Sequence, residues 1–166
     1  CKIWMIDWLP RSSCNLLDVG CAAGAMGKMI REKNLPYNLT GIELSASAAK
    51  IAAPYYDCIH QGDVENMGLN YTDHFDVVIC ADILEHLRDP WKMLRRIRTM
   101  MKPSGYLMCS IPNIRYWRII RDLVIYGDWK YTDSGILDDT HLRFFTRKSF
   151  TGILMSEGFS VRYSSI

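Results

Sequence analysis

The stretch LLDVGCAAG, residues 16–24, decides how this chain folds, because it joins an apolar run to a glycine-containing loop. The glycines at positions 20 and 24 let the backbone turn tightly and approach a ligand closely. A helix is expected directly after the loop, and the N–H groups at its N-terminus suit an anion. The stretch therefore predicts a strand, a turn that can bind a ligand, and a helix.

The spacing of the glycines separates this loop from the common dinucleotide-binding loop. That loop reads G-x-G-x-x-G and holds a pyrophosphate. Here Ala22 stands at the third position of the pattern, and the glycines are spaced G-x-x-x-G. The loop taken alone leaves open which nucleotide-type ligand it binds, and a plain strand–turn–helix without a ligand also remains open.

Strands and helices alternate along the rest of the chain, as hydrophobic spacing and turn residues indicate. The expected strands cover residues 15–19, 38–44, 57–62, 75–81, 105–112 and 159–163. The expected helices cover residues 2–9, 24–33, 45–53, 90–101, 114–126 and 147–157. We expect Ser45 to cap the third helix and a turn at residues 103–105 to introduce the fifth strand. The alternation predicts an α/β fold, with a doubly wound and mostly parallel sheet flanked by helices.

In such a sheet the ligand lies beyond the carboxyl ends of the strands, where the strand order reverses. Glu43 ends the second strand about 20 residues past the loop, where an acid accepts both ribose hydroxyls of a nucleoside. Asp63 follows the third strand and can accept a hydrogen bond from an adenine amino group, while Val64 beside it can pack on the ring. The alternatives are a solvent-facing Glu43 and an ordinary turn aspartate at position 63.

The fourth strand runs directly into the polar stretch ADILEHL, residues 81–87. Polar side chains that follow a buried strand lie at the edge of the sheet where catalysis occurs. In the alternative interpretation Asp82 caps a short helix, and Glu85 and His86 lie on its solvated face.

Together the motifs LLDVGCAAG, GIEL, GDV, FDVVICADILEHL and KPSGYLMCSIPN resemble the class I S-adenosylmethionine (SAM)-dependent methyltransferases over almost the whole chain. This resemblance implies a Rossmann-like fold, SAM as the cofactor and S-adenosylhomocysteine (SAH) as the product. The stretch from Tyr116 to Thr146 resembles a subgroup of bacterial small-molecule methyltransferases. It is also similar to methyltransferase-like proteins associated with methionine biosynthesis.

The resemblance implies roles for residues at each strand end. Asp18, Gly20, Cys21 and Gly24 would line the methionine end of SAM; Glu43 would hold the ribose; Leu44, Asp63 and Val64 would contact adenine; and Ala81 and Asp82 would flank the sulfonium and the methyl group. Ala22 replaces a glycine that is frequent in the family, which we expect to be tolerated if its backbone dihedrals are ordinary. Because the chain ends at Ile166, near a sixth strand, we expect the last antiparallel strand of the family to be missing.

The implied reaction moves a methyl group from SAM to a small-molecule acceptor, with a hydroxyl oxygen expected and a sugar, lipid or quinone-like partner. We expect His86 and His141 to be the candidates for the base, with Asp82 at the reacting edge, and Asp138 and Asp139 to orient His141. His60 and His74 are expected to be structural. The alternatives are a non-catalytic SAM-binding accessory protein that acts through a partner, and a nicotinamide-dependent oxidoreductase, which Ala22 and the ADILEHL edge disfavour.

A metal ion is not expected, but the sequence holds one alternative. Asp82, Glu85 and His86 form D-x-x-E-H, which places three potential ligands within about one helical turn. The pattern resembles the metal motif of ubiquinone-biosynthesis O-methyltransferases and of small-RNA 2′-O-methyltransferases. His141 would complete a set of carboxylates and imidazoles that suits Mg²⁺ or Zn²⁺.

Composition places bounds on these interpretations. The 166 residues fit one domain, residues 1–166, in which 113–145 is expected to be an insertion on the acceptor side. The net charge of +2 gives no reason to expect nucleic-acid binding, and no apolar run approaches the ~20 residues that span a bilayer. Six cysteines without a C-x-x-C pair favour reduced thiols and a cytoplasmic protein. We expect a piece of a longer chain, because the first residue is Cys1, and a homodimer is one expected assembly.

The helix expected at 114–126 places Ile114, Trp117, Ile120 and Val124 along one stripe at helical spacing. Three interpretations stay open for it: a helix that packs its apolar stripe on the core, an acceptor lid with aromatic and basic contacts, and an interfacial membrane helix.

Overall fold

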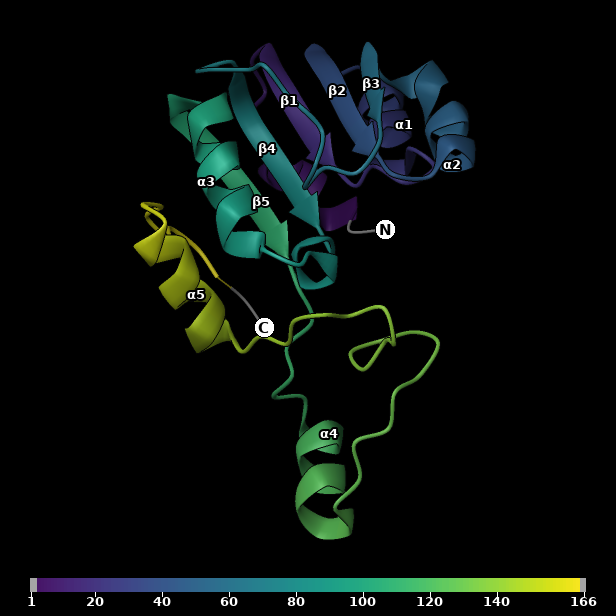
Figure 1. Ribbon diagram of the computed structural model, residues 1–166. Coiled ribbons are helices and arrows are strands. Elements are labelled where there is room, and N and C mark those ends of the chain that lie inside the picture. The colour runs from purple at the N-terminus through teal and green to yellow at the C-terminus, as the bar shows by residue number, and fades with distance from the viewer. Residues whose placement is uncertain (1–2, 165–166) are drawn as a thin grey trace.

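The computed structural model describes residues 3–164, and its centre is one sheet of five parallel strands (Figure 1). The strands are β1 Cys14–Val19, β2 Tyr37–Glu43, β3 Cys58–Gln61, β4 Phe75–Ala81 and β5 Met101–Ser110. Their order in the sheet is β3-β2-β1-β4-β5, so the order reverses between β1 and β4. This reversal places a ligand site at the carboxyl ends of those two strands, and the predicted fold is confirmed.

Helices cover both faces of the sheet. The helices of the described residues are η1 Ile3–Trp8, α1 Ala25–Glu32, α2 Ala46–Ala52, η2 Ala53–Tyr55, η3 Leu84–His86, α3 Pro90–Met100, α4 Trp117–Arg121, η4 Asp122–Tyr126 and α5 Arg147–Ser156, of which α4 and η4 lie away from the sheet (Figure 1). Neighbouring residues of β1 face opposite sides: Leu16 packs with Ile30 of α1, whereas Leu17 packs with Leu94 of α3. Both sides of β1 are therefore buried, as is usual for parallel sheets.

Polar side chains cap the starts of three helices, of which only the Ser45 cap was expected. The Ser45 side chain accepts a hydrogen bond from Ala48 N, which confirms the predicted cap of α2. The Asp89 side chain caps α3 in the same way, through Lys92 N. Thr146 and Ser149 form a reciprocal capping box at the start of α5.

The predicted turn before the fifth strand is wrong, because β5 begins at Met101 rather than at Gly105. Met101 pairs with Phe75 and Tyr106 pairs with Val77, so the four residues 102–105 bulge out opposite Asp76. Gly105 makes this bulge possible, since a Cβ there would lie 3.0–3.2 Å from three backbone oxygens. Lys102 fastens the bulge through a 2.8 Å ion pair with Asp76.

Three further expectations fail in detail. The first helix is a 3-10 helix, Ile3–Trp8, rather than an α-helix. The helix expected from residue 114 begins at Trp117, and its second half, Asp122–Tyr126, is π-helical. The strand expected at 159–163 does not form, so no strand follows α5 within residues 3–164. The described sheet therefore holds only parallel strands.

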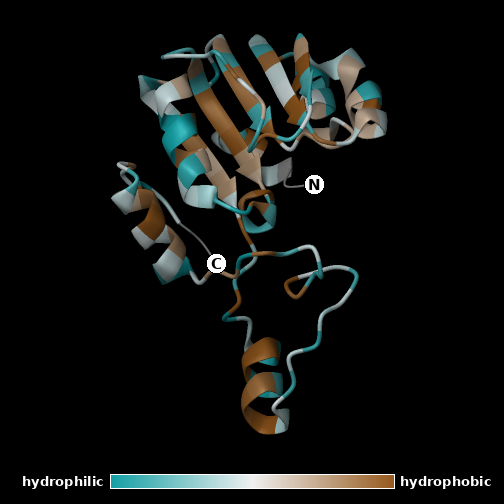
Figure 2. Cartoon of the chain, viewed as in Figure 1, coloured by the Kyte–Doolittle hydropathy of each residue, from teal (hydrophilic) through white to brown (hydrophobic). Residues whose placement is uncertain are grey.

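Residues 113–145 leave the sheet after β5 and return to it before α5. A β-bridge between Asn113 and Phe145 closes this segment at its base, and α4 lies at its far end, away from the sheet (Figure 1). None of the side chains of α4 and η4 is buried, and the helix stands out as an apolar element in Figure 2. None of the described helices is long and apolar enough to cross a membrane. Cys14, Cys21, Cys58, Cys80 and Cys109 are all free thiols, and Cys1 lies outside the described residues.

Candidate functional site

The loop between β1 and α1 needs both of its glycines. Gly20 and Gly24 have φ values of 75° and 80°, in the left-handed region that favours glycine. A Cβ on Gly24 would also lie 2.8 Å from the Cα of Ala52. The N–H groups of Gly20 and Cys21 donate to the carbonyl of Ile42 at 2.9 and 3.0 Å, which ties the loop to the end of β2.

Ala22 in this loop does not have ordinary dihedrals. Its φ is 48°, in the left-handed region that costs a residue with a side chain roughly 1–2 kcal/mol. Ala22 was expected to be tolerated only if its backbone dihedrals were ordinary, and they are not. The loop is therefore locally strained at a position where the family frequently has glycine.

Glu43 connects the loop to the next helix. One carboxylate oxygen accepts a hydrogen bond from Ala22 N at 2.9 Å, and the other accepts one from Ser45 N at 2.8 Å. A carboxylate has about four lone-pair sites, so it retains capacity for ribose hydroxyls. Leu44 beside it is 67% exposed, which is the state expected of an apolar side chain that a bound ring would cover.

The turn after β3, where adenine contacts were expected, is held by hydrogen bonds within the turn. Asp63 accepts hydrogen bonds from Glu65 N at 2.9 Å and from the Asn66 side chain at 2.6 Å. The Val64 side chain is buried in the core, so its backbone rather than its side chain is left at the turn.

Sequence reasoning missed two side chains that hold this turn. Glu65 accepts hydrogen bonds from the N–H groups of Arg88 and Asp89, at 3.0 and 2.8 Å. The Arg96 guanidinium donates to the carbonyls of Val64 and Met67, at 2.6 and 2.7 Å. The glutamate two residues after Asp63 was visible in the sequence, but nothing there indicates its partners, Arg88 and Asp89, just before α3.

Asp82 follows β4 at the point of strand reversal. Its φ is 53°, and one of its carboxylate oxygens accepts a hydrogen bond from Ser110 Oγ at 2.9 Å. The helix-cap alternative for Asp82 is wrong, since η3 begins at Leu84 and its N-cap residue, Ile83, makes no side-chain hydrogen bond to it. The side chain of Ile83 lies 3.0 Å from where a Cβ on Gly20 would be, so the ends of β1 and β4 meet closely.

Asp18 lies beneath the loop. It is only 3% exposed, and its Oδ2 accepts a 2.5 Å hydrogen bond from the Tyr56 hydroxyl. Burial raises the pKa of Asp18 to about 6, the hydrogen bond from Tyr56 opposes that rise, and the negative charge of Glu43 adds to it. Tyr56 was not predicted as a site residue, because nothing in the residues around it in the sequence signals the contact.

His86 and His141 come together, with ring centroids 4.7 Å apart. Nδ1 of His86 lies 3.1 Å from Thr140 Oγ1 and 3.3 Å from the Thr140 carbonyl. The Thr140 hydroxyl proton is directed to Asp138, so both Thr140 oxygens accept. In the neutral imidazole Nδ1 of His86 therefore carries the proton, which leaves the Nε2 lone pair available.

His141 is 8% exposed and is held differently. Its Nδ1 lies 3.0 Å from the carbonyl of Ile136, and its Nε2 lies 4.0 Å from Oε1 of Glu85, which is 1% exposed. Of the two aspartates expected to orient His141, Asp138 contacts it through its backbone carbonyl, which accepts a hydrogen bond from His141 N at 3.0 Å. The Asp138 side chain accepts hydrogen bonds from Thr140, which contacts His86, and the Asp139 backbone N–H donates to the Thr132 carbonyl.

The same cluster can hold a divalent ion. Ligand atoms of Glu85, His86 and His141 all lie within 4.8 Å of one another. Each histidine uses Nδ1 for a hydrogen bond to an oxygen, which is how metal-binding histidines are commonly oriented. Asp82, which the sequence grouped with Glu85 and His86, is not part of this set; His141 takes that place.

The other two histidines lie outside this cluster. His60 Nε2 is 2.8 Å from the Tyr71 hydroxyl, and His74 packs against Tyr71 and Phe75. These contacts agree with the structural roles expected for both.

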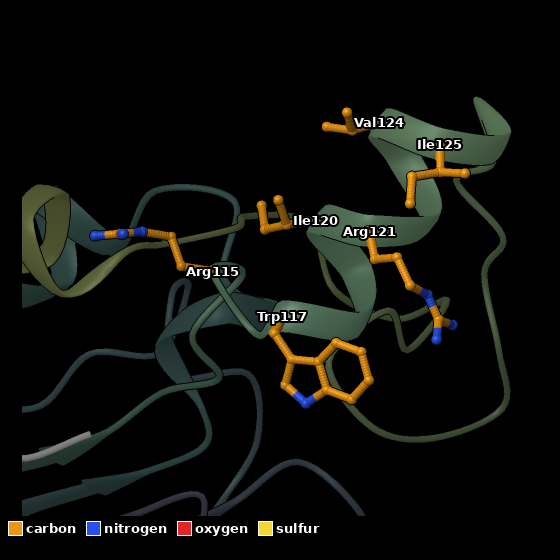
Figure 3. A pocket seen from close by; sticks show the side chains of 6 residues that line it. All are labelled: Arg115, Trp117, Ile120, Arg121, Val124 and Ile125. Carbon is orange, nitrogen blue, oxygen red and sulfur yellow. The ribbon is translucent and has the colours of Figure 1, made fainter.

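A hollow lies on the helix of residues 117–126, where Figure 3 shows its lining side chains. The lining residues are Arg115, Trp117, Ile120, Arg121, Val124 and Ile125. The guanidinium groups of Arg118 and Arg121 lie 5.5 and 5.2 Å from the Trp117 ring, which is cation–π distance. The helix does not pack its apolar stripe on the core, so this interpretation is wrong.

Residues 5–164 match a family model described as a methyltransferase domain. Among curated proteins, the chain is 29% identical over 122 residues to a ubiquinone biosynthesis O-methyltransferase of Albidiferax ferrireducens, covering 66% of this chain and 46% of that protein. It is 32% identical over 108 residues to the protein of the same name from Haemophilus ducreyi, covering 59% of this chain and 45% of that protein. The chain spans about half the length of these relatives.

The fold is similar to that of a SAM-dependent methyltransferase from Mesorhizobium loti, with a TM-score of 0.72 and 18% identity. That alignment covers 96% of this chain and 81% of the other chain. At this level of identity the likeness concerns the fold.

Proposed function

Because this chain belongs to the methyltransferase domain family, we propose that it transfers the methyl group of SAM to a hydroxyl oxygen of a small-molecule acceptor. The observation that carries the proposal is the meeting of the Gly20–Gly24 loop, Glu43 and Asp82 at the strand reversal between β1 and β4.

The donor groups at this edge fit SAM. Gly24, the N-cap residue of α1, makes no side-chain hydrogen bond to the helix. The N-terminus of α1 lies directly after the loop, and its N–H groups suit the methionine carboxylate. Glu43 retains lone pairs for the ribose, and the exposed Leu44 offers apolar cover for adenine. When bound, SAM supplies an electrophilic methyl group on a sulfonium.

Binding and orientation carry much of the catalysis in such a reaction. Holding an acceptor oxygen in line with the methyl group can contribute up to roughly 7–11 kcal/mol. Asp82, fixed by Ser110 at the end of β4, is the residue that we place beside the reacting groups.

We place His86 as the base that takes the proton of the acceptor hydroxyl at Nε2. It is half-buried, and Thr140 fixes the proton on its Nδ1. His141 is buried against Glu85 and supports the His86 ring from the side. Such a base accelerates a proton-coupled step by about 10²–10⁴-fold.

The acceptor that we propose is a phenol-like hydroxyl, as on a quinone precursor. The support is that the matched part of this chain, 66% of it, resembles proteins named ubiquinone biosynthesis O-methyltransferases. Sugar hydroxyls remain the comparison class for the experiment.

The metal-holding geometry favours a second version of the same function. In it Glu85, His86 and His141 hold a divalent ion, which would supply Lewis acidity to the acceptor oxygen in place of a base. His86 cannot serve both as the base and as a ligand through Nε2, so the two versions exclude each other.

The test is to incubate the protein with SAM and catechols, other phenols or sugars, and to measure SAH by liquid chromatography. SAH formation with a phenolic acceptor is the expected result, and His86→Ala should lower it about 10²–10⁴-fold. His74→Ala is the matched control, because its ring packs outside the cluster.

A chelator divides the two versions. Activity that survives EDTA supports His86 as the base, whereas activity that EDTA abolishes and Mg²⁺ or Zn²⁺ restores supports the metal-assisted version. SAH binding without turnover of any acceptor would contradict both and favour a non-catalytic SAM-binding protein.

A further inference from the structure

Tyr56 carries a buried hydroxyl group that has no role in the proposed reaction. It directly follows the short helix η2 as its C-cap residue and is 8% exposed. Its hydroxyl donates to Asp18 Oδ2 at 2.5 Å and accepts a hydrogen bond from Gly27 N at 3.1 Å. One side chain from a third element thus joins the end of β1 to the first turn of α1.

These two elements flank the Gly20–Gly24 loop on either side. Gly27 is the third residue of α1, and the first N–H groups of a helix have no partner within it. The N-cap residue Gly24 makes no side-chain hydrogen bond, so the Tyr56 hydroxyl does for α1 what a capping side chain usually does.

Two glycines make room for the ring. A Cβ on Gly27 would lie 2.4 Å from the Tyr56 ring, and a Cβ on Gly41 would lie 3.1 Å from it. The ring therefore fits against α1 and β2 at once, in a place that only glycines leave open. A ring held on two sides cannot move away from Asp18 without moving α1 or β2.

We propose that Tyr56 is a positioning residue for SAM, which sets the spacing between the end of β1 and the N-terminus of α1 that the methionine end of the cofactor requires. This inference rests on the proposed function, because it takes SAM to be the ligand of the loop. Tyr56 does not touch the cofactor; it acts through Asp18 and Gly27.

The charge of Asp18 makes the role measurable. The groups that face Asp18 are Tyr56, Glu43, Cys21 and Cys80. Burial raises the pKa of Asp18 to about 6, and the Tyr56 hydroxyl lowers it again. The ammonium group of the methionine moiety is attracted by an ionised Asp18, so affinity should rise with pH through this range.

The experiment is calorimetric titration of SAH between pH 5 and pH 8 on the wild type, Tyr56→Phe and Tyr71→Phe. We expect Tyr56→Phe to weaken SAH binding at pH 7 about five- to tenfold, the order of one hydrogen bond. We also expect the inflection in its pH profile to move to higher pH, since Asp18 loses the hydroxyl that stabilises its charge.

Tyr71→Phe is the matched control. It loses a 2.8 Å hydrogen bond to His60 and packs against His74 and Phe75, away from the loop. It should lose stability without a change in SAH affinity. An SAH affinity of Tyr56→Phe within twofold of the wild type, or a weaker affinity with an unmoved inflection, would overturn the positioning role.

If Tyr56→Phe does not fold, a second variant, Asp18→Asn, still tests the inference. Asp18→Asn keeps the size of the side chain and removes the titrating group, so the inflection of the wild type near pH 6 should vanish in it. An inflection that persists in Asp18→Asn contradicts the inference. Absence of SAH binding by the wild type at every pH would instead contradict the proposed function.

Discussion

At the scale of single residues, the strained alanine of the loop between β1 and α1 gives a direct prediction. Ala22 adopts a φ of 48°, a conformation that costs alanine roughly 1–2 kcal/mol and that glycine adopts without this cost. Glycine in turn loses roughly 0.5–1 kcal/mol more conformational entropy on folding than alanine does. Ala22→Gly should therefore raise the free energy of unfolding by about 0.5–1 kcal/mol, as measured by urea denaturation.

The neighbouring alanine supplies the control for that variant. Ala23 is also exposed, and it is not among the described residues with positive φ. Ala23→Gly should lower stability, since it only adds freedom to the unfolded chain. Equal effects of the two variants would show that Ala22 carries no strain.

The pKa of Asp18 predicts how stability depends on pH. Its value of about 6 in the folded protein lies above the ordinary value of 3.8, so the folded state binds more protons than the unfolded state between these values. The contribution of Asp18 to stability is fully present below about pH 3.8 and is lost as the pH rises through 6, by about 3 kcal/mol.

Asp18→Asn isolates this contribution, because carboxylates elsewhere titrate in both proteins. Asp57 and Asp76 have lowered pKa values and act with the opposite sign. Between pH 4 and pH 6.5 the wild type should lose stability relative to Asp18→Asn, as measured by denaturation at each pH. Parallel curves would mean that the folded pKa of Asp18 is ordinary.

At the scale of elements, the contact between α1 and Tyr56 opposes helix propensity. Ala is favoured over Gly within a helix by about 1 kcal/mol, but a Cβ on Gly27 would lie 2.4 Å from the Tyr56 ring. Overpacking of this kind costs about 1–3 kcal/mol, so Gly27→Ala should lower the free energy of unfolding and weaken SAH binding. Gly152→Ala in α5, where a Cβ would meet nothing within 4 Å, should stabilise; the opposite order would contradict the packing account.

The helix of residues 117–126 shows what hydrophobic spacing can and cannot predict. The sequence correctly indicated a helix around Trp117–Tyr126, but the spacing says which side chains share a face and not what covers them. Because Val124 is 76% exposed, Val124→Ser should change stability by less than about 0.5 kcal/mol. Leu94→Ala in the core should cost about 2–5 kcal/mol by the same urea denaturation, and a comparable loss for Val124→Ser would mean that the helix is packed.

At the scale of the whole molecule, the sequence predicted what depends on neighbours along the chain. The five parallel strands and the acid at the end of β2 follow from local alternation and from spacing after the loop. Contacts between distant segments were harder: Tyr56 meets Asp18 38 residues earlier, and Arg96 meets the turn after β3, about 30 residues before it. Local sequence carries no signal of such meetings, because they depend on which helices the sheet brings together.

Pairing between strands explains both the bulge at the start of β5 and the absence of a strand at residues 159–163. Pro103, Ser104 and Gly105 are turn residues in sequence, yet pairing of Met101 with Phe75 extends the sheet on the other side of them. Tertiary pairing therefore overrides a local turn signal here. Residues 159–163 have a strand-like sequence but no partner strand within the described structure.

We propose that SAM binds at the strand reversal between β1 and β4, and calorimetric titration of SAH tests this most directly. We predict saturable binding at one site per chain, weakened in Glu43→Ala, because the Glu43 carboxylate accepts hydrogen bonds from Ala22 N and Ser45 N and is the group that we propose for the ribose. NAD, titrated in the same way, should not bind. Absence of SAH binding by the folded wild type, or binding of NAD in its place, would contradict the account.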